Sequence, residues 1–364
     1  MQGACRGWLE SVVSGDALFR LVLAGKGPTY HKLLMNTPQK ILVRTPNWLG
    51  DLMMATAFLR ALLKQFPDAQ VDLLVKKGFE SIPLPHRGEV LVFDSSLGVK
   101  AMAKQLKGRY YSHGYLLTPS YSSALMFFLG GIKTRVGLKG QFGRSMLLNQ
   151  VPKQVIEERG QHISKEYQLL LDPTGNTEPG LPGLALPKGW SDGLLHGGLN
   201  LKPGFVAIAP GAVYGPAKRW PYEHYLGLIH RLHVAGERVV ILGQEGDFPL
   251  ETTEAENLTG QTSLLELIAL LSRSKVLVSN DSGAMHIMAA LRKPQVAVFG
   301  STSTLWTSPT NPKARVVSLH LDCAPCFKRV CPYGHYKCLH QIDPELVFDA
   351  YLDATGQPAE LADS

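Results

Sequence analysis

The chain has 364 residues, of which 45% are hydrophobic and 18% charged, a composition typical of a globular protein with room for two domains. No run of about 18 apolar residues occurs, which excludes a membrane-spanning helix, and the first residues lack the order of a secretory signal. We therefore expect a cytoplasmic protein, with a formal net charge of +7.

The charge is unevenly distributed along the chain. Residues 37–172 contain 18 basic and 10 acidic residues, whereas residues 203–364 contain 13 basic and 16 acidic ones. A basic half indicates an anionic partner, such as nucleic acid, a phosphorylated lipid or a membrane surface, or else only a solvated basic surface. Nucleic acid is disfavoured, because no nucleic-acid-binding motif and no interleaving of basic with aromatic residues occurs.

The N-terminal extension, residues 1–36, precedes the regular pattern of the chain. Met35 begins MNTPQKILVRTPNWLGD, which is typical of a natural start just before a first strand. The weakly amphipathic segment upstream is a short surface helix, an interfacial anchor or an addition without function. We favour the last and expect residues 1–34 to be dispensable.

Strands and helices alternate from Lys40 onward. Short apolar runs predict strands in the first half at residues 41–43, 71–75, 90–93 and 115–117. A predicted helix follows the first strand and stops at Pro67, and a Pro- and Gly-rich stretch, residues 173–204, is typical of an interdomain connection. Beyond it the same pattern predicts strands at 205–209, 238–242, 276–279 and 296–299, and helices at 222–234, 264–272 and 284–291.

This alternation predicts two parallel sheets, each covered by helices on both faces. The fold class is therefore α/β, with two doubly wound, Rossmann-like domains facing a cleft. Ligands of such sheets bind beyond the carboxyl ends of the strands, so the turns at those ends are the candidate sites.

The first such turn, PNWLGD, contains one glycine, Gly50, followed by Asp51 at the mouth of a helix. It matches neither a dinucleotide-binding glycine motif nor a phosphate-binding loop. Asp51 is either the N-cap of the helix or a carboxylate available as a general base in the cleft, and these roles are compatible. We expect the helix dipole to lower its pKa.

Turns of the second half indicate an anion site. In PGAVYGPAKRWP, Gly211 permits close backbone approach and Lys218 can reach a phosphate. In NDSGAMHI, a helix begins near Gly283, where free N–H groups and the hydroxyl of Ser282 can hold a diphosphate, and His286 lies in the first turn.

Two further features concern the chemistry of a nucleotide donor. The turn LGQEGDFP offers an acid that can accept hydrogen bonds from ribose hydroxyls. No D-x-D pair occurs in the chain, so Lys218 and helix N-termini, rather than a carboxylate-bound metal, would stabilise a leaving phosphate. We therefore predict no catalytic metal.

Four segments, in this order, resemble the ADP-heptose:lipopolysaccharide heptosyltransferases, glycosyltransferase family 9, and most closely the members that add the second heptose. They are PNWLGDLMMATAFLRAL, PGAVYGPAKRWP, NDSGAMHIMAAL and CAPCFKRVCPYGHYKCL, and the resemblance covers about residues 38–350. It implies a GT-B fold and an inverting enzyme of lipopolysaccharide core biosynthesis in Gram-negative bacteria. The enzyme would move L-glycero-D-manno-heptose from ADP-heptose to the inner-core heptose of Kdo–lipid A.

The resemblance also implies a domain plan. An acceptor-binding domain at 37–185 would be joined by a linker at 186–203 to an ADP-sugar-binding domain at 204–335. The C-terminal segment, 336–364, would cross back to the first domain. A basic acceptor domain suits a phosphorylated lipid A core at the inner leaflet, so we expect peripheral attachment to the inner membrane.

The site residues implied by the resemblance fall on both sides of the cleft. Asp51 matches the catalytic base, with Trp48 and Gly50 on the acceptor side. Lys218 matches the phosphate-binding lysine and would act in catalysis as well. The complete donor-binding set is Gly211, Lys218, Glu245 as the ribose-binding acid, Asp281, Ser282, Gly283 and His286.

The cysteines leave one question open. Four of the five lie within sixteen residues, at Cys323, Cys326, Cys331 and Cys338. With nearby histidines, their spacing is compatible with structural zinc. Reduced, packed thiols are favoured in a cytosolic chain, so we expect no cofactor.

Two alternative functions also remain. One is a family 9 transferase that adds heptose or another sugar at a different core position, which the acceptor pocket decides. The other is a non-catalytic nucleotide- or nucleic-acid-binding protein, against which the presence of both Asp51 and Lys218 argues.

Overall fold

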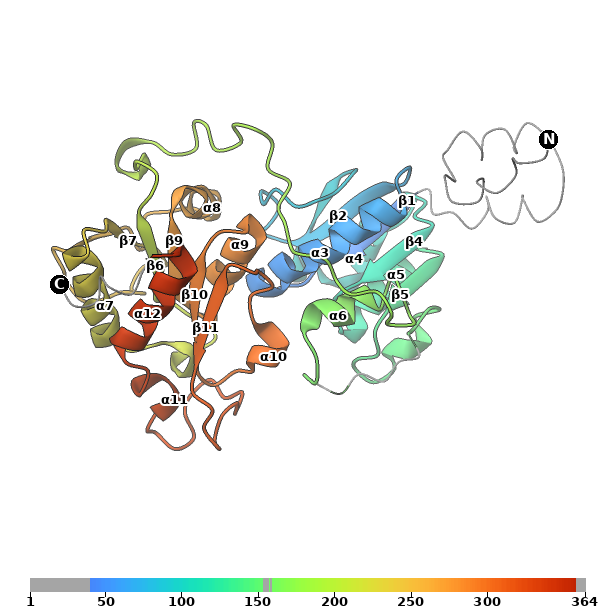
Figure 1. The fold of residues 1–364 in the computed structure, drawn as a ribbon. Coiled ribbons are helices and arrows are strands. Elements are labelled where there is room, and N and C mark those ends of the chain that lie inside the picture. Colours follow the sequence, from blue (N-terminus) through green and yellow to red (C-terminus); the bar gives the residue numbers. More distant parts are fainter. Residues whose placement is uncertain (1–39, 153–156, 158, 358–364) are drawn as a thin grey trace, which may run out of the picture.

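The computed structural model describes residues 40–152, 157 and 159–357. The extension at 1–36, including Cys5, lies outside the described residues. The described chain forms two α/β halves, the first at the right and the second at the left of Figure 1.

The first half is built on a parallel sheet in the order β3-β2-β1-β4-β5. Its strands are β1 (Lys40–Arg44), β2 (Gln70–Lys76), β3 (Val90–Phe93), β4 (His113–Leu116) and β5 (Thr134–Gly137). Its helices are α3 (Leu49–Gln65), η1 (Ser95–Leu97), α4 (Gly98–Leu106), α5 (Tyr121–Leu129), η2 (Arg144–Met146) and α6 (Ile163–Gln168).

The second half is built on a six-stranded parallel sheet in the order β11-β10-β9-β6-β7-β8. Its strands are β6 (Val206–Ala209), β7 (Val239–Ile241), β8 (Ala255–Asn257), β9 (Val276–Asn280), β10 (Gln295–Phe299) and β11 (Ala314–Ser318). Its helices are η3 (Gly197–Leu199), η4 (Pro216–Lys218), α7 (Tyr222–Val234), α8 (Leu264–Arg273), α9 (Gly283–Leu291), α10 (Thr304–Thr307), α11 (Lys337–His340) and α12 (Pro344–Thr355).

The two sheets confirm the predicted pair of doubly wound domains. Every strand predicted from an apolar run is present within about two residues, and the predicted helix 222–234 coincides with α7. Strands β1, β6, β9 and β10 are almost wholly buried because helices cover both faces of each sheet.

The halves meet where α3 packs against α9. Apolar side chains of both helices belong to one continuous core, among them Leu52 and Met53 of α3 and Ile287 and Met288 of α9. This contact brings the N-termini of the two helices together, and each of them directly follows a central strand of its own sheet.

The Pro- and Gly-rich connection is attached to both halves rather than free between them. Its Gly183 N donates to Thr56 Oγ1 of α3 at 2.9 Å, and Ala185 N donates to Pro83 O at 2.8 Å. Nearer the second half, Arg273 Nη1 donates to Asn200 Oδ1 at 3.0 Å. The connection therefore follows the surface of the first half before it enters the second.

The C-terminal helix corrects one expectation. The segment 336–364 was expected to cross back to the first domain, but α12 packs on α7 and on β9, β10 and β11 of the second half. Its apolar face, which includes Val347, Phe348 and Tyr351, is buried in the core of that half. This covers the second sheet and leaves α12 no apolar face for the first half.

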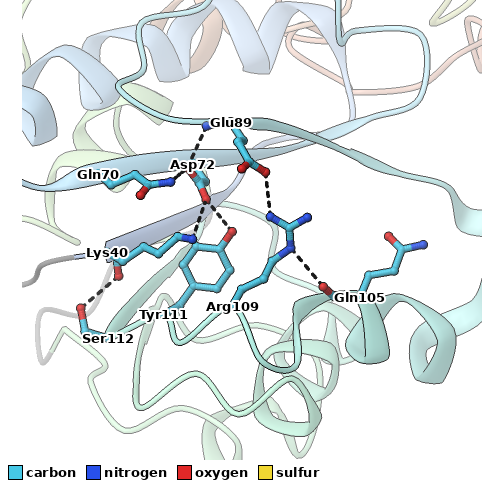
Figure 2. Close-up of polar contacts among 8 residues, drawn as sticks. All are labelled: Lys40, Gln70, Asp72, Glu89, Gln105, Arg109, Tyr111 and Ser112. Carbon is cyan, nitrogen blue, oxygen red and sulfur yellow. Dashed lines mark hydrogen bonds and ion pairs between the residues drawn. The ribbon is translucent and has the colours of Figure 1, made fainter.

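A buried carboxylate holds the amino ends of the first sheet together, as Figure 2 shows. Asp72 of β2 is fully buried and accepts hydrogen bonds from Tyr111 Oη at 2.7 Å and Glu89 N at 2.8 Å. Gln70 Nε2 donates to it at 2.9 Å, and Lys40 Nζ lies 3.8 Å away. Because its partners lie on or beside β1, β2, β3 and β4, this network braces the sheet at the edge opposite the cleft.

Candidate active site

A cavity of about 560 Å³ opens between the two halves. Its walls are the turns that follow β1, β6, β7 and β9, together with residues of α10 and of the segment before α11. The cavity therefore lies beyond the carboxyl ends of both sheets, where ligands of doubly wound domains bind.

The structure brings most of the predicted site residues to this one cavity. Its lining includes Trp48, Gly50, Asp51, Gly211, Lys218, Asp281, Ser282, Gly283 and His286. Glu245 lies in the turn after β7 but outside the lining, where a Cβ added to Gly260 would be 3.0 Å from Glu245 Cβ. Gln244 and Asp247 of that turn line the cavity instead.

Asp51 lies in the first turn of α3 but does not cap it. The N-cap is Trp48, and no side-chain hydrogen bond caps the helix. Burial raises the pKa of Asp51 to about 6; the charge of Lys218 opposes the shift and that of Asp281 adds to it. The expectation of a dipole-lowered pKa is therefore wrong, because desolvation in the cavity outweighs the helix terminus.

A second acid, which no sequence motif marked, lies near Asp51. Glu166 belongs to the short helix α6, which packs on α3. Burial raises its pKa to about 7; the indole of Trp306 opposes the shift, and the charge of Asp51 adds to it. The base candidate thus lies in a region that disfavours negative charge.

Lys218 forms a buried ion pair at the other side of the cavity. Its Nζ donates to Asp281 Oδ2 at 2.5 Å, and Thr302 Oγ1 donates to the same oxygen at 2.6 Å. The Lys218 ammonium also lies 4.8 Å from the ring centre of Tyr214. The ion pair with Asp281 and the ring of Tyr214 hold the Lys218 ammonium at the N-terminus of α9.

The first turn of α9 carries polar groups that lack protein partners. Within the described residues, the buried Ser282 Oγ and His286 Nδ1 make no hydrogen bond. Burial lowers the pKa of His286 to about 4, although Asp281 Oδ1 lies 4.0 Å from its Nε2. The imidazole is therefore neutral near pH 7, and the positive charge here comes from Lys218.

Gly211 lines the cavity, and a neighbouring side chain also requires a glycine there. A Cβ added to it would lie 2.0 Å from Asp247 Oδ2, which accepts a hydrogen bond from Gln244 N at 2.8 Å. The glycine therefore makes room for a carboxylate that shapes the turn after β7.

Several cavity residues were not predicted. Tyr214 stands in a quoted motif, but nothing in the pattern marked its ring, which the guanidinium of Arg329 approaches to 5.4 Å. Arg159 contacts the rings of Trp306 and Phe327 at 5.1 and 4.2 Å. These residues come from segments far apart in sequence, so no local spacing could have identified them.

The cysteine segment holds four free thiols, at Cys323, Cys326, Cys331 and Cys338. Burial, followed by the charges of the other three thiols, raises the pKa of Cys338 to about 11, so the four lie near one another. Over residues 40–152, 157 and 159–357, no group of three His, Cys, Asp or Glu side chains has the arrangement of a metal site.

The sequence pattern of glycosyltransferase family 9 (heptosyltransferase) matches residues 99–337. The chain belongs to glycosyltransferase family 9. It is a glycosyltransferase, as predicted, and it is 30% identical over 342 residues to lipopolysaccharide heptosyltransferase 2 of Escherichia coli strain K12. That match covers 85% of this chain and 97% of the relative.

Solved structures of the family share the architecture. The structure of E. coli ADP-heptose lps heptosyltransferase II matches with a TM-score of 0.73 and 29% identity, over 87% of this chain and 98% of that one. E. coli heptosyltransferase WaaC with ADP matches with a TM-score of 0.66 and 20% identity, over 86% and 99% of the two chains. The predicted GT-B fold of this family 9 enzyme is confirmed.

Proposed function

We propose that this enzyme transfers L-glycero-D-manno-heptose from ADP-heptose to the inner-core heptose of Kdo–lipid A. The observation that carries the proposal is one cavity lined by Asp51 of the first half and by the Lys218–Asp281 pair of the second. Relatives that share its length are named heptosyltransferase 2, which supports the second heptose as the transferred group.

Asp51 acts as general base in this proposal. The acceptor hydroxyl attacks C1 of the heptose while the bond from C1 to the diphosphate oxygen breaks. The bonding electron pair leaves with ADP, the hydroxyl proton passes to Asp51, and the anomeric centre inverts. A base whose pKa is about 6 is ionised at neutral pH and binds a proton more tightly than an ordinary aspartate does.

Lys218 stabilises the negative charge that grows on the departing ADP. The N-terminus of α9, with Ser282 and Gly283, holds the diphosphate through free N–H groups and an unpartnered hydroxyl. Glu245 accepts hydrogen bonds from the ribose. Since Asp247 rather than Glu245 lines the cavity, Glu245→Gln and Asp247→Asn should be compared for ADP affinity, and a loss only in the latter would reassign the ribose acid.

The acceptor is a phosphorylated lipid, and it binds the first half. In this plan residues 37–185 bind the acceptor and 204–335 bind the ADP-sugar, with 186–203 between them. The net charge of +8 over residues 37–172 supports an anionic acceptor. No helix in the described part of the chain is long and apolar enough to cross a bilayer. In this proposal the basic first half holds the enzyme as a peripheral protein at the cytoplasmic face of the inner membrane.

The experiment is incubation with ADP-heptose and Kdo–lipid A that carries one heptose, followed by mass analysis. We expect a product heavier by one heptose, no product with the acceptor that lacks the first heptose, and product formation slowed by roughly 10²–10⁴-fold with Asp51→Asn. Transfer only to a different core position would support the other family 9 function, and ADP binding without transfer to any core acceptor would overturn the proposal.

A further inference from the structure

The first half carries a long segment without any acidic residue. From Ser95 to Ile156 the chain contains nine Lys or Arg residues and no Asp or Glu. This segment includes α4, β4, α5 and β5, of which β4, α5 and β5 lie toward the side of the first half that faces away from the second half (Figure 1). Arg144 is buried and Arg109 is paired with Glu89, so the positive surface of the segment rests on the exposed lysines at 100, 104, 107, 133 and 139. Several exposed charges of one sign attract an extended anionic partner rather than a single ion.

Exposed apolar side chains lie within the same segment. Of the sixteen large hydrophobic side chains that are exposed in the described residues, five fall between positions 121 and 146. We name them the apolar ridge: Tyr121, Phe128, Leu129, Phe142 and Met146. Phe142 is fully exposed and Met146 is 88% exposed, which is unusual for side chains of this size unless they contact a partner.

The ridge is one continuous surface. The loop after β5 is joined to the start of α5, because Tyr121 N donates to Gln141 Oε1 at 2.8 Å and a Cβ on Gly143 would lie 3.3 Å from the Tyr121 ring. It is joined to the end of α5 as well, because Arg135 lies over the Phe128 ring and donates to Leu147 O at 2.6 Å.

A buried arginine keeps the loop from folding over its own apolar side chains. Arg144 is fully buried, and no acidic side chain of the described residues pairs with it; its guanidinium donates to Leu138 O at 3.0 Å, to Ser123 Oγ at 3.0 Å and to Ser120 O. With the backbone fixed in this way, Phe142 and Met146 on either side of Arg144 are held in solvent.

We propose that the apolar ridge docks this enzyme on an anionic lipid bilayer, with Phe142 and Met146 inserted at the headgroup boundary and Lys133 and Lys139 on the anionic headgroups. Binding of this kind scales with the buried apolar area and with the attraction of basic residues to acidic lipids. Phe142 and Met146 lie at the same edge of the sheet as Asp51, since the loop after β5 and the turn before α3 both follow carboxyl ends of strands. Phe128 and Leu129, at the end of α5, lie toward the opposite edge. The inference rests on the proposed function, for which docking would place the first half beside a lipid acceptor.

The test is cosedimentation of the full chain with vesicles of phosphatidylethanolamine and phosphatidylglycerol, and with phosphatidylcholine vesicles for comparison. Phe142→Ser with Met146→Ser should weaken binding by on the order of 10²-fold, since each inserted side chain contributes about tenfold. Each of Lys133→Glu and Lys139→Glu should weaken it by about fivefold or more, and added salt should weaken the wild type. Val234→Ser with Leu346→Ser, a matched pair on α7 and α12, should bind as the wild type does.

Two readouts separate this inference from the proposed function. The Phe142/Met146 variant should lose transfer to an acceptor embedded in vesicles but keep transfer to the deacylated, water-soluble acceptor. Absence of transfer to the water-soluble acceptor by the wild type would count against the proposed function and not against the docking surface. Phe142→Trp should be quenched by brominated lipid, and Val234→Trp should not. Unchanged vesicle binding by the double serine variant would overturn the inference. So would a dimer, detected by light scattering, that the same two substitutions convert to a monomer, because a second copy of the chain would then cover the ridge.

Discussion

Gly50 of the first half lies against the imidazole of His286 of the second half, and a Cβ added to Gly50 would be 2.7 Å from His286 Cδ2. The contact is reciprocal, because a Cβ added to Gly283 would be 2.9 Å from Leu49 Cδ2. Both distances are shorter than a Cβ can tolerate. The two glycines therefore allow the N-termini of α3 and α9 to cross at a closeness that any side chain would prevent.

Gly50→Ala should destabilise the protein by about 1–3 kcal/mol, because the new methyl overpacks a contact that a rigid ring closes. Turnover should fall too, since Asp51 is the next residue. The double variant Gly50→Ala with His286→Ala should recover much of the stability lost by Gly50→Ala, which chemical denaturation measures as a coupling energy. Gly180→Ala, where an added Cβ meets nothing within 4 Å, is the control. If the effects of the two substitutions on the free energy of unfolding were additive, the imidazole of His286 would move aside for the new methyl group without loss of stability.

Asp51→Asn should separate activity from stability. As the general base, Asp51 should contribute roughly 10²–10⁴-fold to kcat, while ADP affinity changes little. Burial raises its folded pKa from 3.8 to about 6, so the ionised carboxylate destabilises the fold fully above pH 6 and not at all below pH 4. The asparagine variant should therefore be more stable than the wild type at pH 8, by on the order of 1–3 kcal/mol, and no more stable at pH 4. A variant that is less stable at pH 8 would contradict the burial of this charge.

The pH profile should show the same group. The rate kcat/KM for the acceptor should fall tenfold per pH unit below about pH 6, whereas an aspartate with an ordinary pKa would keep the rate until about pH 4. Glu166, whose pKa burial raises to about 7, is the neighbour that has to be excluded. In Glu166→Gln the fall of kcat/KM at low pH should remain. If this fall disappeared in that variant, it would be assigned to Glu166 and not to Asp51.

Lys218→Ala should lower kcat by roughly 10²-fold or more, because the charge it neutralises grows as the sugar bond breaks. ADP affinity should fall as well, and the acceptor KM should change little. The substitution also strands the buried Asp281 carboxylate, so Lys218→Ala with Asp281→Asn tests whether lost folding explains the defect. Steady-state kinetics with each substrate varied would show weaker donor binding at unchanged kcat if Lys218 only holds the nucleotide.

Chelation should leave transfer intact, because the proposed charge stabilisation comes from Lys218 and a helix terminus. The measurement is transfer at saturating substrates after dialysis against EDTA. Activity that is lost and then restored by Mg²⁺ would show a metal-dependent donor site. A slow loss that only Zn²⁺ restores would instead implicate the four clustered cysteines.

Most strands that the sequence identified are buried on both faces; β3 is an edge strand, but its run of four apolar residues made it recognisable. Buried runs such as 41–43 and 276–278 are continuous in apolar residues and are found in β1 and β9. The strands that were missed, β5, β8 and β11, lie at sheet edges, where partial exposure admits polar residues and breaks the run.

The same limit applies to the site. Turn positions were predictable because strand ends of one sheet share an edge, and so Asp51, Lys218 and Ser282 were found. The pKa of Asp51, the partner of Gly50 and the presence of Glu166 depend on contacts between segments more than 100 residues apart, or on burial that only the assembled cleft produces. The prediction that the C-terminal helix crosses back to the first half was wrong, because the sequence of α12 shows that it has an apolar face but not which half this face packs against.

The crossing of α3 and α9 sets where the molecule can flex. Besides the shared core, His162 Nε2 donates to Ser308 O across the halves at 2.9 Å. A rotation of one half against the other about this crossing would move Asp51 and the donor turn, which lie beside it, less than residues farther away. We therefore expect such a rotation to open the outer part of the cavity to substrates and products while the distance from Asp51 to the donor turn changes little.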